Sequence, residues 1–462
     1  MNKSRNFFLT GLLAMIGLIV LGVVFFKEKI AFGDTAYQAV LLLIDQRPSV
    51  VWIRAGSMIP QLVPLTAIWL HAGLRTVMIL HSVSFLIFFL VIYLVAYRYS
   101  GKKMLFLVIP LYLILITNEV FYWPQSELQQ GMVWLGLYAV LLFEGRWSKL
   151  SLPLFVFAHF LFILWIQFFH PLIFFPIAFL LVYYYDDAGA LFSRRSYYIL
   201  GACLLSFGIR SIVGVLDVYE RSKLNLIRAI KKNLPHFFSL DSVHVFINKI
   251  PTAYLVYILF LCTGMVWLLI HKKKLKALAL FSFSIGYWLL IMISSSEDGR
   301  FYTENMLLPL GFIAALPIAV DIIPTLRPTY TIVGLIIIIV VRLGAIYQAH
   351  VDYTARYSVY EPYLSYSKKN KLTGVIVDDK LIDNKKAIMT WASGYETMLV
   401  TALHSPDSCM IVQTAAAPDS SRMYLNKDTL IVTVYGLWGK NQVPHRYFNL
   451  APGRYEIIKS PQ

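Results

Sequence analysis

The amino-acid sequence predicts an all-α polytopic membrane domain followed by a small α/β domain outside the membrane. The chain of 462 residues is 58% hydrophobic and 14% charged, and its mean hydropathy is +0.66. This composition leaves too little polar surface to cover a soluble globule of this size. Apolar runs recur as far as residue 347, and helical patterns alternate with β-branched runs after them. These observations together define the fold class.

We expect a transmembrane domain over residues 1–347 with about 11 helices, because an apolar run of about 20 residues can cross a hydrocarbon core of roughly 30 Å. The runs lie at residues 6–26, 77–97, 104–117, 129–143, 152–168, 172–185, 197–215, 251–270, 277–294, 305–320 and 329–347. The first run is predicted to be retained, since no small-residue cleavage site follows Phe26 before Lys27. Two long outer loops, 27–76 and 217–250, interrupt the series.

Residues 49–74 are predicted to lie along the membrane surface. They are only moderately apolar, carry Arg54 and His71, and are interrupted by Pro60 and Pro64. A lipid-exposed crossing with these prolines would leave helix carbonyl groups without donors. A further span here would also move every later loop to the other side of the membrane, so that the basic short loops faced outward.

The short loops that are rich in basic residues all fall on one side of this topology. They contain Lys3, Arg5, Arg98, Lys102, Lys103, Arg146, Lys149, Arg194, Arg195, Lys272–Lys274, Lys276 and Arg327. Such loops stay in the cytoplasm. We therefore expect a cytoplasmic N-terminus in the cell membrane and an extracytoplasmic C-terminal domain, which is periplasmic if the cell is Gram-negative. The formal net charge of +16 then reflects anchoring to the lipid bilayer, and no nucleic acid partner is expected.

The second long loop is basic and aromatic. Leucine and isoleucine side chains recur at helical spacing between residues 224 and 234, which favours a helix on the membrane surface. Arg221, Lys231 and Lys232 in this loop are candidates for binding a lipid phosphate.

Residues 348–462 are the part of the chain with a soluble pattern. A Tyr-rich helical pattern near residues 350–367 and a second one near 395–404 alternate with β-branched runs at 374–377, 410–412 and 429–434. This alternation predicts a small α/β domain.

Asp34 is the first candidate catalytic residue, because it directly follows the first span and opens a long outer loop. An acid in this place can accept a proton from a substrate hydroxyl. The structural alternative is a helix N-cap, since Asp before the sequence Thr-Ala-Tyr-Gln is a good capping signal. One residue can combine both roles.

Two further candidates for catalysis lie in short outer loops. Glu127 stands at the start of the fourth span with no basic neighbour in sequence, and it either faces a substrate cavity or is an ordinary solvated acid. Glu119 in the same loop is a candidate for substrate binding. His170 lies in a turn so short that it must sit near the outer face, where it serves catalysis or bonds to a neighbouring helix end.

Arg300 is the only basic residue in a short outer loop. Its planar guanidinium suits a lipid phosphate. The alternative is an ion pair with one of the acids nearby in sequence, which are Glu297, Asp298 and Glu304. Tyr302 and Arg54 complete the candidate substrate-binding residues.

The order of these features resembles the polytopic membrane glycosyltransferases of the GT-C superfamily, which includes protein mannosyltransferases and lipid A aminoarabinose transferases. The resemblance covers about the first 350 residues. It consists of Gly33-Asp34 after the first span, a surface-helical first loop, the sequence Tyr-Trp-Pro-Gln-Ser-Glu at 122–127, and Gly-Arg-Phe-Tyr at 299–302 ahead of a proline-containing span.

The resemblance implies a sugar donor linked to polyprenyl phosphate and an acceptor that is a glycan, a lipid or a protein. It gives Asp34 the role of base or of ligand to a divalent metal ion such as Mg²⁺ or Mn²⁺, and it gives Arg300 the role of binding the donor phosphate. Asp34 is followed by Thr35 rather than by the second carboxylate that is usual in the family, which leaves metal dependence open.

Three other classes share part of the pattern. A polymerase or ligase of surface polysaccharide has a similar topology, but it normally concentrates its arginines in one large late loop. A transporter needs ionisable groups or broken helices at the bilayer midplane, whereas the predicted spans are largely free of acids. A non-enzymatic scaffold that presents the tail has no need of Asp34, Glu127 or Arg300.

Overall fold

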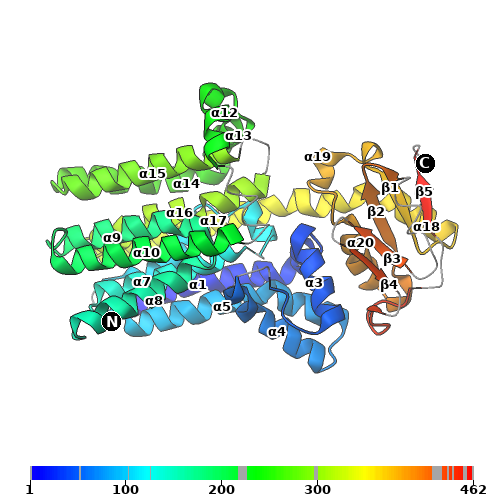
Figure 1. Cartoon of the computed structure of the whole chain (residues 1–462), viewed down its shortest axis with the longest axis horizontal. Coiled ribbons are helices and arrows are strands. Elements are labelled where there is room, and N and C mark those ends of the chain that lie inside the picture. The colour runs from blue at the N-terminus through cyan, green and yellow to red at the C-terminus, as the bar shows by residue number, and fades with distance from the viewer. Residues whose placement is uncertain are drawn as a thin grey trace.

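The computed structural model consists of a bundle of roughly parallel helices that carries a small α/β domain at one end (Figure 1). It describes residues 3–50, 54–101, 103–124, 126–216, 226–295, 300–418, 429–433, 436–439, 442–450 and 455–459. Lys3 and the α/β domain lie at opposite ends of the bundle (Figure 1). We call the end with the α/β domain the domain end.

The bundle is formed by helices that follow the apolar runs of the sequence. They are α1 (Lys3–Val24), α5 (Leu74–Tyr99), α6 (Val108–Leu115), α7 (Glu127–Phe143), α8 (Leu152–Gln167), α9 (Phe174–Asp187), α10 (Arg194–Leu216), α14 (Leu255–Ile270), α15 (Lys274–Ser294), α16 (Arg300–Pro317) and α17 (Pro328–Ala355). A helix thus lies at each predicted span. Short π-helical turns, Ile250–Tyr254 and Ile318–Ile322, precede α14 and follow α16.

Seven helical segments among the described residues are long and apolar enough to cross a membrane. They are Lys3–Val24, Leu74–Tyr99, Arg194–Leu216, Asp241–Ile270, Lys274–Ser294, Arg300–Ile322 and Pro328–Lys369. The helices over residues 105–115, 127–143, 152–167 and 174–187 are shorter. The structure therefore describes a multi-pass membrane protein, while the count of about 11 crossings remains a prediction.

Short helices follow α1 at the domain end (Figure 1). They are α2 (Phe26–Ile30), α3 (Gly33–Asp45) and α4 (Met58–Trp69). At 1.5 Å per residue, the 12 residues of α4 extend about 18 Å, which is too short for the hydrocarbon core. In the second long loop, α12 (Leu226–Asn233) and α13 (Asp241–Lys249) project beside the ends of α14 and α15 (Figure 1).

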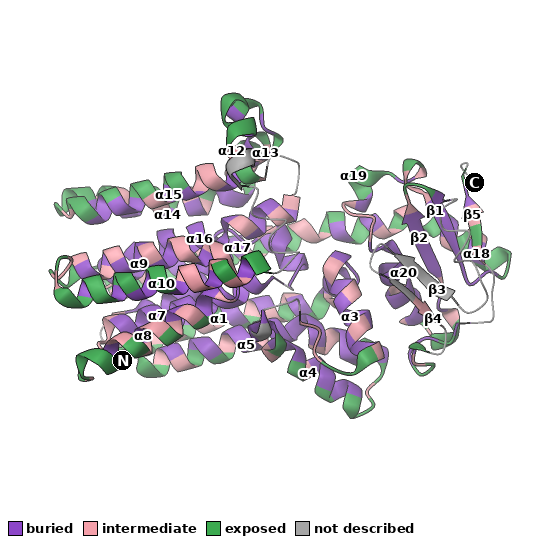
Figure 2. Ribbon diagram, in the orientation of Figure 1, coloured by how far each residue is buried: buried purple, intermediate pink, exposed green. Residues whose placement is uncertain are grey.

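Burial places α16 at the centre of the bundle. Of its membrane-length window, 94% is buried, compared with 33% for Arg194–Leu216. Helices such as α10 and α14 instead expose leucines on their outward faces, for example Leu204, Leu205 and Leu259 (Figure 2). An apolar exterior around a central helix suits a protein whose solvent is lipid.

A buried ionic cluster joins helices at the end opposite the α/β domain. Lys276 of α15 contacts Asp187 of α9 at 2.6 Å and Asp321 after α16 at 3.2 Å. Lys273 binds Asp321 at 2.5 Å, and Lys103 binds the other acid. Charges buried in a membrane protein are costly unless they are paired, so this cluster fixes how α9, α15 and α16 are arranged.

The tail contains a parallel sheet in the order β2-β1-β5. Its strands are β1 (Gly374–Asp378), β2 (Ile411–Ala415) and β5 (Tyr455–Ile458), and an antiparallel pair consists of β3 (Thr429–Thr433) and β4 (Gly436–Gly439). The helices are α18 (Glu361–Lys369), α19 (Asn384–Ala387) and α20 (Ser393–Ala402). The predicted strands near 374, 410 and 429 correspond to β1, β2 and β3. Helix α17 runs unbroken through the predicted boundary at residue 347 to Ala355.

Candidate functional site

Asp34 lies in the first turn of α3, which begins at Gly33. The φ angle of Gly33 is +49°, a conformation that glycine adopts without strain. Phe32 occupies the N-cap position, and no side chain caps the helix there. The alternative prediction of Asp34 as the N-cap is therefore wrong. Its carboxylate stands inside the first turn, where the positive end of the helix dipole favours negative charge.

The carboxylate of Asp34 accepts a hydrogen bond of 2.9 Å from the hydroxyl of Tyr302. Tyr302 belongs to the first turn of α16. The ring of Trp123, in the short loop between α6 and α7 that we call the α6–α7 loop, packs against the ring of Tyr302 at 4.8 Å. Three segments that are far apart in sequence thus meet at this point. Asp34 and Tyr302 are both half-buried, so neither residue is completely removed from solvent.

Arg300 is held between two carboxylates close to this point. Its Nε and Nη2 atoms donate to Glu119 at 3.2 and 3.0 Å, and Nη2 also contacts Asp352 of α17 at 2.5 Å. Lys249 binds the same Glu119 carboxylate at 2.8 Å. Glu119 and Arg300, which the sequence predicts as substrate-binding residues, are therefore brought together by an ion pair.

Of the alternative partners predicted for Arg300, Glu297 and Asp298 lie outside the described residues, so an ion pair with either of them stays a prediction. Glu304 is buried and accepts the backbone N–H groups of Asn118 and Val120 at 2.5 and 2.9 Å. Glu304 therefore holds the α6–α7 loop on α16. The two amides lie at the start of the short helix η3 (Glu119–Tyr122), where backbone N–H groups have no partner within the helix.

Glu127 and Arg54 form a second pair at the start of α7, at 2.9 Å and with both side chains almost fully buried. The sequence shows no basic neighbour for Glu127, because its partner is 73 residues away. This contact neutralises the acid and fixes the first long loop against α7. The prediction that Glu127 acts in catalysis stays a prediction, with Arg54 now as its immediate partner.

The remaining predicted site residues have local or outlying positions. His170 caps the short helix Pro171–Ile173, because its Nδ1 atom accepts the N–H of Leu172 at 3.2 Å. Lys231 and Lys232 are exposed on α12, and Arg221 lies outside the described residues. Contacts described for these residues do not include Asp34.

Arg342 of α17 has a structural role. Its guanidinium is 1% exposed and donates to the carbonyl oxygens of Ile114 and Thr117 at 2.7 Å each and to that of Ala253 at 2.5 Å. It thereby joins α17 to the ends of α6 and the π-helical turn before α14.

A contact from the C-terminal domain holds the loop in front of Asp34. One carboxylate oxygen of Glu396, on α20, accepts the N–H of Gly33 at 2.7 Å. The other binds the guanidinium of Arg356, which also donates to the carbonyl oxygen of Ala31 at 3.2 Å and lies over the ring of Phe32. We call Glu396, Arg356 and Gly33 the α3 clamp.

The α3 clamp is completely buried, since both side chains of its ion pair are 0% exposed. Burial raises the pKa of Glu396, an effect opposed by Arg356 and by the N–H of Gly33. A Cβ atom on Gly33 would lie 2.9 Å from the sulfur of Met389, so close packing by the tail also favours glycine here. Sequence patterns give no sign of this contact, because its partners are 363 residues apart.

A divalent metal at Asp34 finds few protein ligands nearby. Within the described part of the chain, no three His, Cys, Asp or Glu side chains come together as metal ligands. The described neighbour of the Asp34 carboxylate is a phenol, which is a donor to it. A Mg²⁺ or Mn²⁺ ion there would need oxygen atoms from substrate or water to complete its coordination.

The fold and these contacts define a multi-pass membrane protein. Its domain end carries an acid bound to Tyr302, the packed rings of Trp123 and Tyr302, and a cluster of Arg300 with two carboxylates. In comparisons with known proteins, no family model, no curated protein and no solved structure matches the chain.

Proposed function

We propose that the protein is a membrane glycosyltransferase that moves a sugar from a polyprenyl-phosphate donor to a lipid, glycan or protein acceptor, with its domain end on the outer side of the membrane. The observation that carries this proposal is the Asp34–Tyr302 contact, where three segments converge at one end of the helices. Tyr302, which binds the half-buried Asp34, lies in the same first turn of α16 as Arg300. Glycosyl transfer from a phosphate requires both a base and a cationic group.

In this reaction the acceptor hydroxyl loses its proton to Asp34 while its oxygen forms a bond to the anomeric carbon of the sugar. The bond between that carbon and the phosphate oxygen breaks, and the phosphate leaves with the electron pair. A positioned carboxylate supplies the general base. The hydroxyl of Tyr302 keeps the carboxylate oriented, because it donates a hydrogen bond to one of its oxygens.

Arg300 can bind the leaving phosphate by exchanging one of its two carboxylate partners for it. The side chain of Asp352 is 59% exposed, whereas that of Glu119 is 7% exposed. An exposed ion pair contributes little stability, so a phosphate displaces Asp352 at low cost. Glu119 then keeps the guanidinium in place, and the phosphate gains a charge-assisted hydrogen bond.

The first test is the Asp34→Asn variant in proteoliposomes supplied with polyprenyl-phosphate sugars and a panel of glycan and lipid acceptors. Asn can still accept the hydrogen bond from Tyr302 but cannot take up a proton. We expect transfer to fall by at least about a hundredfold, with expression and thermal stability unchanged. Transfer at the wild-type rate would remove Asp34 from the chemistry.

The second test separates the donor site from the base. Arg300→Lys keeps the charge and loses the planar fork, so the apparent KM for the donor should rise while an exposed control, Arg47→Lys, leaves it unchanged. Transfer from a nucleotide sugar alone would contradict the proposed donor. If none of the lipid-linked donors supports sugar transfer, the result would favour the polymerase, transporter or scaffold alternatives.

A further inference from the structure

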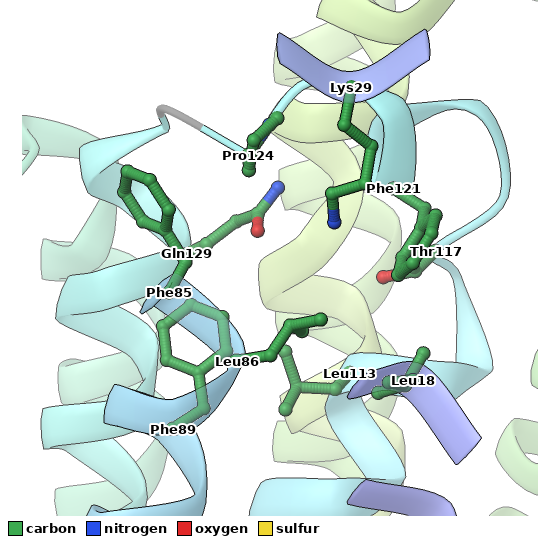
Figure 3. A pocket seen from close by; sticks show the side chains of 10 residues that line it. All are labelled: Leu18, Lys29, Phe85, Leu86, Phe89, Leu113, Thr117, Phe121, Pro124 and Gln129. Atoms are coloured by element: carbon green, nitrogen blue, oxygen red, sulfur yellow. The ribbon is translucent and has the colours of Figure 1, made fainter. Parts of the chain in front are cut away.

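Lys29 of α2 points into a cavity inside the domain end of the bundle (Figure 3). Its side chain is 1% exposed, and its ammonium group lies 3.7 Å from the centre of the Phe121 ring. The walls are mainly apolar and come from α1, α5, α6 and the α6–α7 loop. Leu18, Leu86 and Leu113 are among the residues that form them. A cationic group thus faces a narrow space of low polarity.

No carboxylate among the described residues contacts this ammonium, and the ring of Phe121 is its described partner. Three other buried cations have a carboxylate partner: Arg54 has Glu127, Lys276 has Asp187 and Asp321, and Arg356 has Glu396. The buried guanidinium of Arg342 bonds to three carbonyl oxygens. Removing a charge from water without a counter-charge costs several kcal/mol. The apolar surroundings of Lys29 would therefore favour a negatively charged partner, and the described residues do not supply one.

Two polar side chains point into the same space as Lys29. Gln129 of α7 is 8% exposed, and its Nε2 atom has no hydrogen-bond partner in the described structure. The carboxamide of Gln129 and the hydroxyl of Thr117 both turn toward the ammonium (Figure 3). The nitrogen and oxygen of an amide are assigned from its hydrogen bonds, so Gln129 can present its NH₂ group to a ligand by rotation. Three donors and no acid then surround the cavity.

We propose that this cavity binds a small monovalent anion, with chloride as the physiological ion of that size, between Lys29, Gln129 and Thr117. The cavity volume of about 20 Å³ decides the class of ligand. Space for one water-sized sphere requires about 10–15 Å³ on this measure. The cavity therefore admits a single-atom anion, while a phosphate with four oxygens or a sugar does not fit.

The binding is linked to the protonation of Lys29. Burial lowers the pKa of Lys29 from 10.5 to about 7, and a bound anion reverses this effect by favouring the charged form. None of the other residues that line the cavity is titratable. Charged or titratable groups on the neighbouring elements contact other residues. Among the acids, Glu28 accepts a hydrogen bond from Thr354, Glu119 binds Arg300 and Lys249, and Glu127 binds Arg54. Of the histidines, His81 stacks on Phe85 and His350 stacks on Phe25.

The first experiment measures the thermal stability of the purified full-length protein in sodium chloride and in sodium gluconate, whose anion is too large for the cavity. We expect chloride to raise the Tm at pH 6.5, and we expect its apparent affinity to fall about tenfold per pH unit above the pKa of Lys29. Lys29→Met should abolish the difference between the salts. Gln129→Leu should weaken chloride binding and leave the folded state intact.

The matched control is Lys274→Met, because that lysine is exposed at the start of α15. It should respond to chloride as the wild type does. An equal response to chloride in wild type and Lys29→Met would overturn the proposal. A bromide-soaked crystal provides an independent readout: anomalous density between Lys29 and Gln129 supports the site, and density for water alone contradicts it. None of these measurements depends on glycosyl transfer.

Discussion

At the scale of single residues, burial rather than local sequence sets the chemistry of Lys29. In sequence it belongs to the charged stretch Lys27-Glu28-Lys29, which resembles the solvated end of a span. In the fold, Lys29 turns into the bundle, whereas Glu28 accepts a hydrogen bond of 2.9 Å from Thr354 on α17. Two neighbouring charges therefore have different environments, because α2 is packed on both sides.

This environment predicts a pH-dependent stability. In buffer without small anions, Lys29 has a pKa of about 7 when folded and 10.5 when unfolded. Between these values the unfolded chain binds more protons, so stability rises with pH. Below pH 7 the burial of this charge costs up to about 5 kcal/mol. Lys29→Met should therefore be more stable than wild type at pH 6, with the difference vanishing near pH 10.5.

The measurement is thermal unfolding of both proteins in detergent across this pH range. The difference between wild type and Lys29→Met isolates the lysine, because the other titrating groups are shared. A difference that stays constant between pH 6 and 10.5 would show that Lys29 titrates normally.

At the scale of elements, the α3 clamp connects the C-terminal domain to the helix that carries Asp34. Glu396 binds the backbone at Gly33, one residue before the proposed base, and Arg356 binds both Glu396 and the carbonyl oxygen of Ala31. Helix α20 thereby fixes the first turn of α3. This gives the α/β domain a positioning role in the proposed reaction.

Removal of this carboxylate should loosen the start of α3. Glu396→Ala leaves Arg356 buried without its partner, which costs about 3–5 kcal/mol. Hydrogen exchange should become faster for amides 31–36, and kcat should fall more than the donor KM rises, because Asp34 is displaced rather than removed. Glu361→Ala, an exposed acid in the same domain, serves as the control.

Glu396→Gln distinguishes positioning from a purely electrostatic effect. The amide oxygen can still accept the N–H of Gly33, so this variant should retain more activity than Glu396→Ala. Unchanged exchange at residues 31–36 in Glu396→Ala would contradict the role of the clamp.

At the scale of the whole molecule, the arrangement makes a prediction about sidedness. Lys3 and the α/β domain lie at opposite ends of the bundle (Figure 1). An odd number of crossings, whether seven or about 11, would place the start of α1 and the C-terminal domain on opposite sides of the membrane. The basic short loops predict that the end with Lys3 lies in the cytoplasm.

Cysteine labelling in intact cells tests this orientation. Cys262 is the exposed one of the three free cysteines, so Cys262→Ser provides the background. Arg47→Cys and Lys380→Cys should react with an impermeant reagent from outside, whereas Lys149→Cys and Lys274→Cys should react only after permeabilisation. Each of these side chains is exposed. Labelling of position 380 only after permeabilisation would reverse the orientation and the proposed outer site.

The sequence by itself determined which segments become helices and strands. Apolar runs require helices, because backbone groups in lipid need internal hydrogen bonds, and the runs from 6–26 to 329–347 all lie in helices. The β-branched runs near 374 and 410 similarly became neighbouring strands. It also singled out Asp34 and Tyr302 separately, through their positions beside predicted spans.

Only the tertiary structure decided which charges meet. Arg300 pairs with Glu119 and Asp352, which are distant in sequence, and Glu127 pairs with Arg54. Lys29 faces a cavity. The physical reason is that the energy of a buried charge depends on the groups packed across from it. Those groups come from other helices, so their identity is set by packing and is absent from the local sequence pattern.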